Sequence, residues 1–180
     1  MRIFTIISIL LLSLFAGDYK KCWFTSLSTD GMMRPFKNCI KIIDDDDYTN
    51  SDAQLSEHII KELVLKKGSL EYIHSSDYGE FYVNESGFIR RAKFFDNGAD
   101  YFEEGLARTK VKGKIGFFDK DLKIVIPPIF DFAFPFKNGI SIVCMGCKSQ
   151  KDGEHWSVIG GKWGTINKKG EIVSALKEKI

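Results

Sequence analysis

The chain has 180 residues, which suits one or two small domains with a buried core. Its formal net charge of +2, with basic and acidic residues interleaved, argues against the clustered basic surface of a nucleic-acid-binding protein. Phe is frequent, at 15 residues beside only 4 Met, and this enrichment favours β-structure over a helical bundle.

The first residues resemble an export signal. Met1 and Arg2 supply a positive start, and the apolar run from Ile3 to Phe15 is shorter than the roughly 20 residues that span a bilayer. Residues 1–17 therefore predict a cleavable bacterial signal peptide, with an uncleaved anchor as the alternative. We expect a periplasmic or secreted mature chain with no membrane span after cleavage.

Four cysteines give the exported chain an even number of thiols. Cys22 and Cys39 form one local pair and Cys144 and Cys147 another, so we predict these two disulfides among the three possible pairings. The Cys144-x-x-Cys147 spacing also suits half of a zinc site or a redox motif. No second close pair and no βαβ pattern accompanies it, so a structural disulfide is the favoured interpretation.

Residues 18–67 predict a lead-in segment with one strand and one helix. The strand covers Cys39–Ile43 and ends at four adjacent carboxylates, Asp44, Asp45, Asp46 and Asp47. That acidic run lacks the ligand alternation and the turn glycine of a calcium loop, so it predicts a solvated loop with a possible role in contacting a partner.

Residues 51–66 predict an amphipathic helix packed on the β-part. Apolar residues recur at four-residue spacing at Leu55, Ile59 and Leu63, and Ser51 is suited to cap the first turn.

Residues 68–180 predict a β-domain of tandem hairpins. Short β-rich runs alternate with three similar turns, at 84–87, 119–122 and 167–170, each opening with Asn or Asp. Leu122 replaces the glycine that ends the other two turns, which we expect to cost turn stability.

The hairpins repeat one sequence pattern. Residues 161–173 are a second version of residues 113–125, and the interval from Gly79 to Gly113 equals that from Gly105 to Gly139. The last copy is delayed by an insertion at 144–160, which contains the second cysteine pair and a polar stretch. Such a repeat buries its apolar faces by stacking units on one another.

The order of these motifs resembles the WG-repeat family of bacterial proteins. Gly161-Lys162-Trp163-Gly164 resembles the opening motif, Ile126 to Asp131 the middle, and Phe102 to Ala107 the end, over roughly residues 68–175. Ile115 replaces the name-giving Trp in the second unit, and the first unit lacks the Trp and the second Gly. The resemblance implies β-hairpin modules without a defined catalytic set, many of them exported, with toxin-neutralising immunity proteins as one possibility.

The repeated motif residues are predicted to be structural. Aromatic residues at fixed repeat positions fill seams between units, glycines permit close approach or positive φ, prolines end strands, and an Asp accepts turn hydrogen bonds. This set comprises Gly113, Gly116, Pro127, Pro128, Phe130, Asp131, Phe136, Gly139, Gly161, Trp163, Gly164 and Gly170.

No catalytic, cofactor-binding or metal-binding constellation stands out. There is no Gly-x-Ser-x-Gly elbow, no His-Glu-x-x-His and no phosphate loop. We therefore expect a non-catalytic module that binds a protein, with a delivered toxin as the most concrete target. Its candidate contact residues are the acidic run and the insertion residues Lys151, His155 and Trp156.

Two other functions stay open. Exposed aromatics such as Trp23, Tyr101 and Trp156 are suited to stack on envelope polysaccharide or peptidoglycan. An uncharacterised hydrolase built from distant residues is the second alternative.

Overall fold

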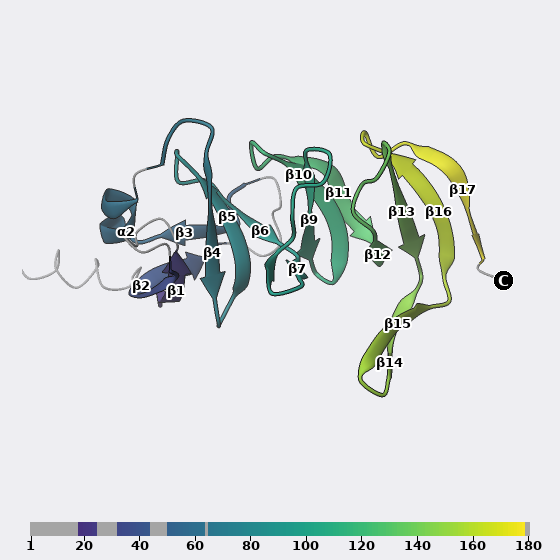
Figure 1. Cartoon of the computed structure of the whole chain (residues 1–180), viewed down its shortest axis with the longest axis horizontal. Helices are drawn as coiled ribbons and strands as arrows, with labels where there is room; N and C mark the ends of the chain where they lie inside the picture. Colours follow the sequence, from purple (N-terminus) through teal and green to yellow (C-terminus); the bar gives the residue numbers. More distant parts are fainter. Residues whose placement is uncertain (1–17, 25–31, 44–49, 64, 179–180) are drawn as a thin grey trace, which may run out of the picture.

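The computed structural model describes residues 18–24, 32–43, 50–63 and 65–178, and over these residues the chain is mainly β with antiparallel pairing. Figure 1 shows the sheets side by side along one axis, with the N-terminal sheet at one end and β17 at the other. The elements are β1 (Lys20–Phe24), β2 (Arg34–Ile42), β3 (Ala53–Leu55), α2 (Glu57–Glu62), β4 (Leu70–Ser75), β5 (Gly79–Asn84), β6 (Ile89–Ala92), β7 (Phe94–Phe95), β8 (Gly98–Ala99), β9 (Leu106–Val111), β10 (Lys114–Asp119), β11 (Ile124–Phe130), β12 (Phe132–Ala133), β13 (Ile140–Met145), β14 (Lys148–Asp152), β15 (His155–Ile159), β16 (Lys162–Asn167) and β17 (Ile172–Glu178).

Three similar meanders make up the array. We call β4–β5–β6 the first unit, β9–β10–β11 the second, and β13–β16–β17 the third. The first unit continues through β1 and β2 to β3 in one six-stranded sheet, so the lead-in strands extend the first repeat. β12 lies beside β13, and the pairs β7–β8 and β14–β15 form two small separate sheets.

The three predicted hairpin turns are present with one shared geometry. In each turn the fourth residue donates its backbone N–H to the carbonyl of the first, from Gly87 to Asn84, Leu122 to Asp119 and Gly170 to Asn167. The fourth residue has a positive φ in all three, including 64° at Leu122. The Leu122 side chain is fully buried, and this burial offsets the strain of its backbone.

Apolar clusters fill the seams between the units. Between the first and second units, Phe102 and Phe118 pack with ring centroids 5.5 Å apart. Between the second and third, Phe117 and Phe136 pack at 4.8 Å. A third cluster lies within the first sheet and includes Ile59 of α2. Each seam is thus an edge-to-face aromatic contact surrounded by aliphatic side chains.

The predicted helix over 51–66 is wrong. Residues 53–55 form β3 instead, and α2 spans only Glu57–Glu62. The Ser51 hydroxyl accepts the backbone N–H of Ile89 at 2.9 Å and donates to Ala53 O at 2.9 Å, which ties this segment to β6. Pairing with the neighbouring strands therefore outweighs the helical spacing of the apolar residues.

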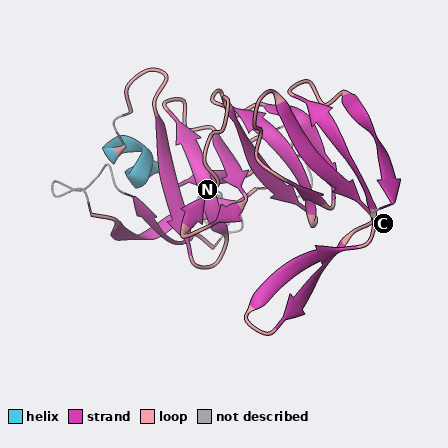
Figure 2. Ribbon diagram, turned by 45° about the vertical axis from the view of Figure 1, so that its right-hand side comes forward, coloured by secondary structure: helices cyan, strands magenta, loops and turns pink. Residues whose placement is uncertain are grey.

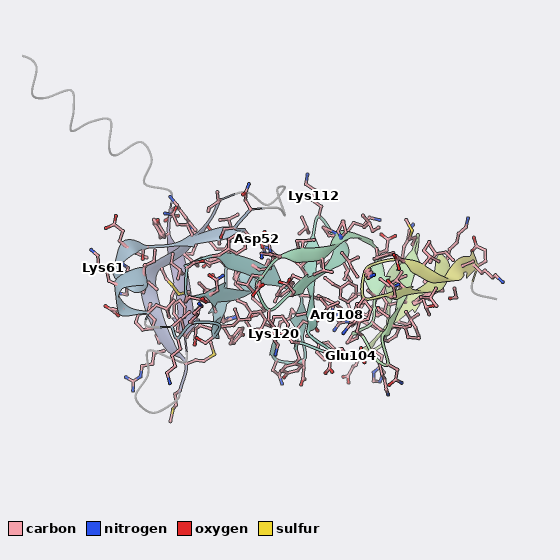
Figure 3. The ribbon with its side chains drawn as sticks, turned by 90° about the horizontal axis from the view of Figure 1, so that it is seen from above. Asp52, Lys61, Glu104, Arg108, Lys112 and Lys120 are labelled. Carbon is pink, nitrogen blue, oxygen red and sulfur yellow. A yellow bond between two sulfur atoms is a disulfide. The ribbon has the colours of Figure 1, made fainter. Side chains whose placement is uncertain are left out.

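Buried ion pairs join one unit to the next. Arg108 pairs with Asp100, at 2.9 Å from Nε to Oδ2, and donates Nη1 to Ala133 O at 2.9 Å on the approach to the third unit. Arg90 likewise pairs with Asp52 at 2.9 Å and donates Nε to Leu122 O at 3.0 Å in the second unit. Figure 3 labels Asp52 and Arg108 along the middle of the array.

Burial of the Asp52 side chain raises the pKa of its carboxyl, although the charge of the paired Arg90 acts in the opposite direction.

Two glycines allow the second and third strands of a unit to cross closely. A Cβ at Gly116 would lie 2.5 Å from Ile126 O, and one at Gly164 would lie 2.7 Å from Ser174 O. The pairing of β10 with β11 shifts register between Ile115 and Phe117, on either side of Gly116. Pro127 follows Ile126 in β11, and a proline, which has no backbone N–H to donate, is expected at such an irregularity.

Candidate functional site

The insertion in the third unit forms a projecting hairpin, which we call the arm. It consists of β14 and β15, paired in register from Lys148 with Ile159 to Asp152 with His155. Figures 1 and 2 show the arm extending away from the stacked sheets. Apart from half-buried Val158, every arm-strand side chain that the structure describes is exposed.

The arm is fixed at its base by several contacts. Cys144 and Cys147 form the predicted disulfide across the start of the insertion, with Cα atoms 6.1 Å apart. The Trp163 indole donates to Gly160 O at 2.8 Å on the returning side. A two-stranded hairpin without a core is marginal in water, so these base contacts position the arm and limit its freedom.

Asp131 connects the arm base to the second unit. Its Oδ2 accepts the Gly146 backbone N–H at 2.6 Å, and its Oδ1 accepts Lys114 Nζ at 2.5 Å. The hydrogen bond from Lys114 holds the pKa of the Asp131 carboxyl below its ordinary value, with a further contribution from Gly146. Asp131 thus binds a backbone amide between the two cysteines.

The arm presents two different faces, because cross-strand partners lie on the same side of a sheet. Trp156 lies opposite Lys151 on one face, beside Ser149 and Val158. His155 lies on the other face. Trp156 is 68 % exposed, the highest exposure of any large apolar side chain in the described chain. The structure therefore brings Lys151 and Trp156 together and separates them from His155.

The remaining predicted site residues lie elsewhere. Asp44, Asp45, Asp46 and Asp47 fall outside the described residues, as does the predicted signal segment 1–17. Trp23 lies on β1 at the opposite end of the array from the arm and packs on His74, with ring centroids 5.1 Å apart. Tyr101 is exposed and packs edge-to-face on Phe95.

Both predicted disulfide pairings are confirmed. Cys22 and Cys39 link β1 to β2, with Cα atoms 5.7 Å apart and both side chains fully buried. The Cys144–Cys147 pair closes the arm base. Among the described residues, no group of three or more His, Cys, Asp and Glu side chains is placed to hold a metal ion.

An apolar groove between β7 and the third unit was not found by sequence reasoning. It has a volume of about 660 Å³ and is lined mainly by Phe95, Phe134, Phe136, Ile140 and Ile142. The signal was present in the alternation of β13, where Ile140 and Ile142 point away from buried Ser141 and Val143.

A buried carboxylate network in the first unit was also not predicted. Tyr72 donates its hydroxyl to Glu80 Oε2 at 2.5 Å, and His74 Nδ1 lies 3.0 Å from Glu80 Oε1. Burial, aided by Glu80, raises the pKa of the Tyr72 phenol. Two polar partners on adjacent strand β4 therefore satisfy the buried Glu80 side chain.

Comparison with protein families identifies one match, to the family described as "WG containing repeat", over residues 115–148. That segment runs from β10 through β13 to the first residue of the arm. No curated protein and no solved structure matches the chain. No helix within the described ranges is long and apolar enough to cross a membrane.

Proposed function

Because this chain is a WG-repeat protein, we propose that it is an exported, non-catalytic binding module whose repeats present the arm to a protein partner. The observation that carries the proposal is Trp156, a large apolar side chain in the arm that no core requires. Trp is enriched among the residues that dominate the binding energy of protein interfaces. The rest of the fold then acts as a support.

The geometry of the arm suits recognition of a folded protein. Its base is held by the disulfide and by Asp131, so little backbone freedom remains to be lost on binding. Its outer strand edges carry backbone groups that can pair with an extended segment of a partner. Lys151 lies opposite Trp156 and places a positive charge beside its apolar ring. That charge favours partners with complementary charge next to the apolar contact and so adds specificity.

The cysteines and the N-terminal sequence support the proposed cellular setting. Two cysteine pairs at disulfide distance are compatible with an oxidising compartment outside the cytosol. The apolar segment that starts the chain supports export to the periplasm or beyond. A delivered toxin neutralised there is the most concrete partner for a small module of this kind.

Affinity capture with the full chain tests the proposal. Bait proteins are wild type, Trp156→Ala, and Phe94→Ala as a matched control at another exposed aromatic outside the arm. We expect wild type and Phe94→Ala to retain one stoichiometric protein from extracellular and envelope fractions. Trp156→Ala should bind it at least about tenfold more weakly, as measured by calorimetry with the purified partner. Equal binding by all three baits would remove the arm from the interaction.

Envelope glycan is the second candidate, because the exposed Trp156 ring is also a stacking platform for a sugar. Fluorescence titration with peptidoglycan fragments separates it from the first. A glycan-binding arm gives a saturable change that disappears in Trp156→Phe, whereas a protein-binding arm gives no change in either protein.

A further inference from the structure

The outer face of the third unit has the composition of a stacking surface. Phe132, Phe134, Ile140, Ile142, Trp163, Thr165 and Ser174 form this surface, which we call the end face. It lies on the side of the sheet opposite buried Val143 and Ile166, which pack against the second unit. No described residue forms a further sheet over it.

The repeat shows what such a face normally contacts. Ile140 holds the position of Leu106, since each forms the same isolated bridge, to Lys137 and to Glu103 respectively. Leu106 is covered by the next unit and is 7 % exposed, whereas Ile140 is 39 % exposed. A face that is buried by a sheet of this chain in the second unit is therefore open in the third.

The neighbouring position gives the same result. Ile142 occupies the position of Arg108, which is 2 % exposed beneath the third unit, and Ile142 is 45 % exposed. Phe134 replaces Asp100 in the same comparison, so an apolar pair stands where the second unit has its buried ion pair. The end face thus matches, position by position, the face of the second unit that is buried in a seam, and at these two positions it is more apolar than that face.

The polar residues of the end face do not prevent burial. Thr165 occupies the position of Phe117 and Ser174 that of Ile126, and the Thr165 hydroxyl donates to Ser174 Oγ at 2.9 Å. This hydrogen bond satisfies the Thr165 donor within the pair and so lowers the cost of burying the two hydroxyls. Charged side chains lie at the margin of the end face: Lys177 is opposite Trp163 on the edge strand, and Lys137 forms the bridge to Ile140.

From these observations we propose that two copies of this chain associate through their end faces. In the second unit, the equivalent face already packs against a sheet of this repeat, through the side of that sheet that carries Val143 and Ile166. The opposite end of the array is covered by α2, whose Ile59 is buried in the first sheet, so head-to-tail stacking is blocked. Two end faces related by a twofold axis instead give a closed dimer that leaves both arms available.

Sedimentation equilibrium of the full chain tests this proposal, over concentrations from about 1 to about 100 µM. We expect a reversible dimer whose dissociation constant increases at least about tenfold in Ile142→Glu. Ile129→Glu is the matched control, because Ile129 is 49 % exposed on β11 and lies outside the end face. It should dimerise like the wild type.

Ile140→Glu provides a second end-face variant, and circular dichroism verifies that each variant is folded. A wild-type monomer at all concentrations, or a dimer weakened equally by Ile129→Glu and the end-face variants, would overturn the proposal. The arm is not involved, so Trp156→Ala should dimerise normally. Loss of partner binding and loss of the dimer are thereby distinguished.

Discussion

Several single side chains in this protein connect neighbouring parts of the array through hydrogen bonds and ion pairs. Asp131 connects the second unit to the arm base through Lys114 and Gly146, and Arg108 connects Asp100 to a carbonyl of the next unit. The sequence predicted that Asp131 would accept hydrogen bonds in a turn. It did not indicate Lys114 or Gly146 as the donors, because both are distant in the chain.

Asp131→Asn should lower the free energy of unfolding by about 1–2 kcal/mol at pH 7, because it removes a charge-assisted hydrogen bond. The pKa of Asp131 is lowered in the folded state, so its stabilisation is complete above the unfolded value of about 3.9 and is lost as pH falls through the folded pKa. Urea unfolding at pH 7 and at about pH 2.5 measures the difference, which should shrink at the lower pH.

Asp121→Asn is the control for that variant, since Asp121 is highly exposed and lies 3.8 Å from Lys123. It should change stability by less than about 0.5 kcal/mol. A difference for Asp131→Asn that stays constant with pH would contradict the role assigned to its charge.

Removing one partner of the Asp100–Arg108 pair should lower the free energy of unfolding more than replacing both partners by apolar residues. Asp100→Asn leaves the buried guanidinium without its carboxylate, and we expect a loss of about 3 kcal/mol. Asp100→Phe combined with Arg108→Ile copies the apolar pair Phe134 and Ile142 of the third unit. The double variant should unfold at a higher urea concentration than Asp100→Asn; if it is the less stable of the two, the apolar pair does not fit this seam.

At the level of elements, the hairpins were predictable and the N-terminal segment was not. The turns at 84–87, 119–122 and 167–170 were predicted because their hydrogen bonds join residues close in sequence. The helix over 51–66 failed because Ser51 and residues 53–55 bond to β6 and β2, contacts that a helical periodicity does not reveal.

The candidate site was predicted in part for the same reason. The insertion, its cysteine pair and Trp156 were visible as a break in the repeat, whereas the separation of His155 from Trp156 required the register of the arm strands. For the apolar groove and the end face, the alternation of β13 showed which side chains share a face, but not which of the two faces the neighbouring unit covers.

The two disulfides should differ in their effect on stability. Cys22→Ala with Cys39→Ala opens a 17-residue separation and should cost about 3 kcal/mol in unfolding free energy. Cys144→Ala with Cys147→Ala opens a separation of 3 and should cost clearly less, because the loop-closure entropy is smaller. Urea unfolding compares the two.

Hydrogen exchange over 148–159 locates the second effect. Loss of the Cys144–Cys147 bond should speed exchange in the arm and leave the first sheet unchanged. Equal acceleration in both regions would show that the arm base supports the whole fold.

At the scale of the whole molecule, the array should fold without its arm. Met145 pairs with Lys162 in the third unit as Val111 pairs with Lys114 in the second, where Lys112 and Gly113 alone close the hairpin. Both of these turn residues have positive φ, as a tight hairpin turn requires.

Replacing residues 146–161 by Lys-Gly, together with Cys144→Ala, should therefore give a folded protein. We expect its Tm to lie within about 5 °C of the wild-type value, because the arm strands contribute no residue to the apolar clusters. Calorimetry measures the shift. Loss of the cooperative transition would mean that the arm is part of the folding unit.

The turn at Lys112 and Gly113 has a consequence for how such proteins diversify. The same hairpin turn holds two residues in the second unit and an entire arm in the third, with the strand pairing below it unchanged. It is therefore an insertion site at which a new recognition element can be added without redesigning the scaffold, and the turn of the second unit is another such site. Moving the arm to the turn at Lys112 and Gly113 would shift its position along the array by one repeat. Binding by such a variant would show whether the partner contacts the arm alone or also the sheets beside it.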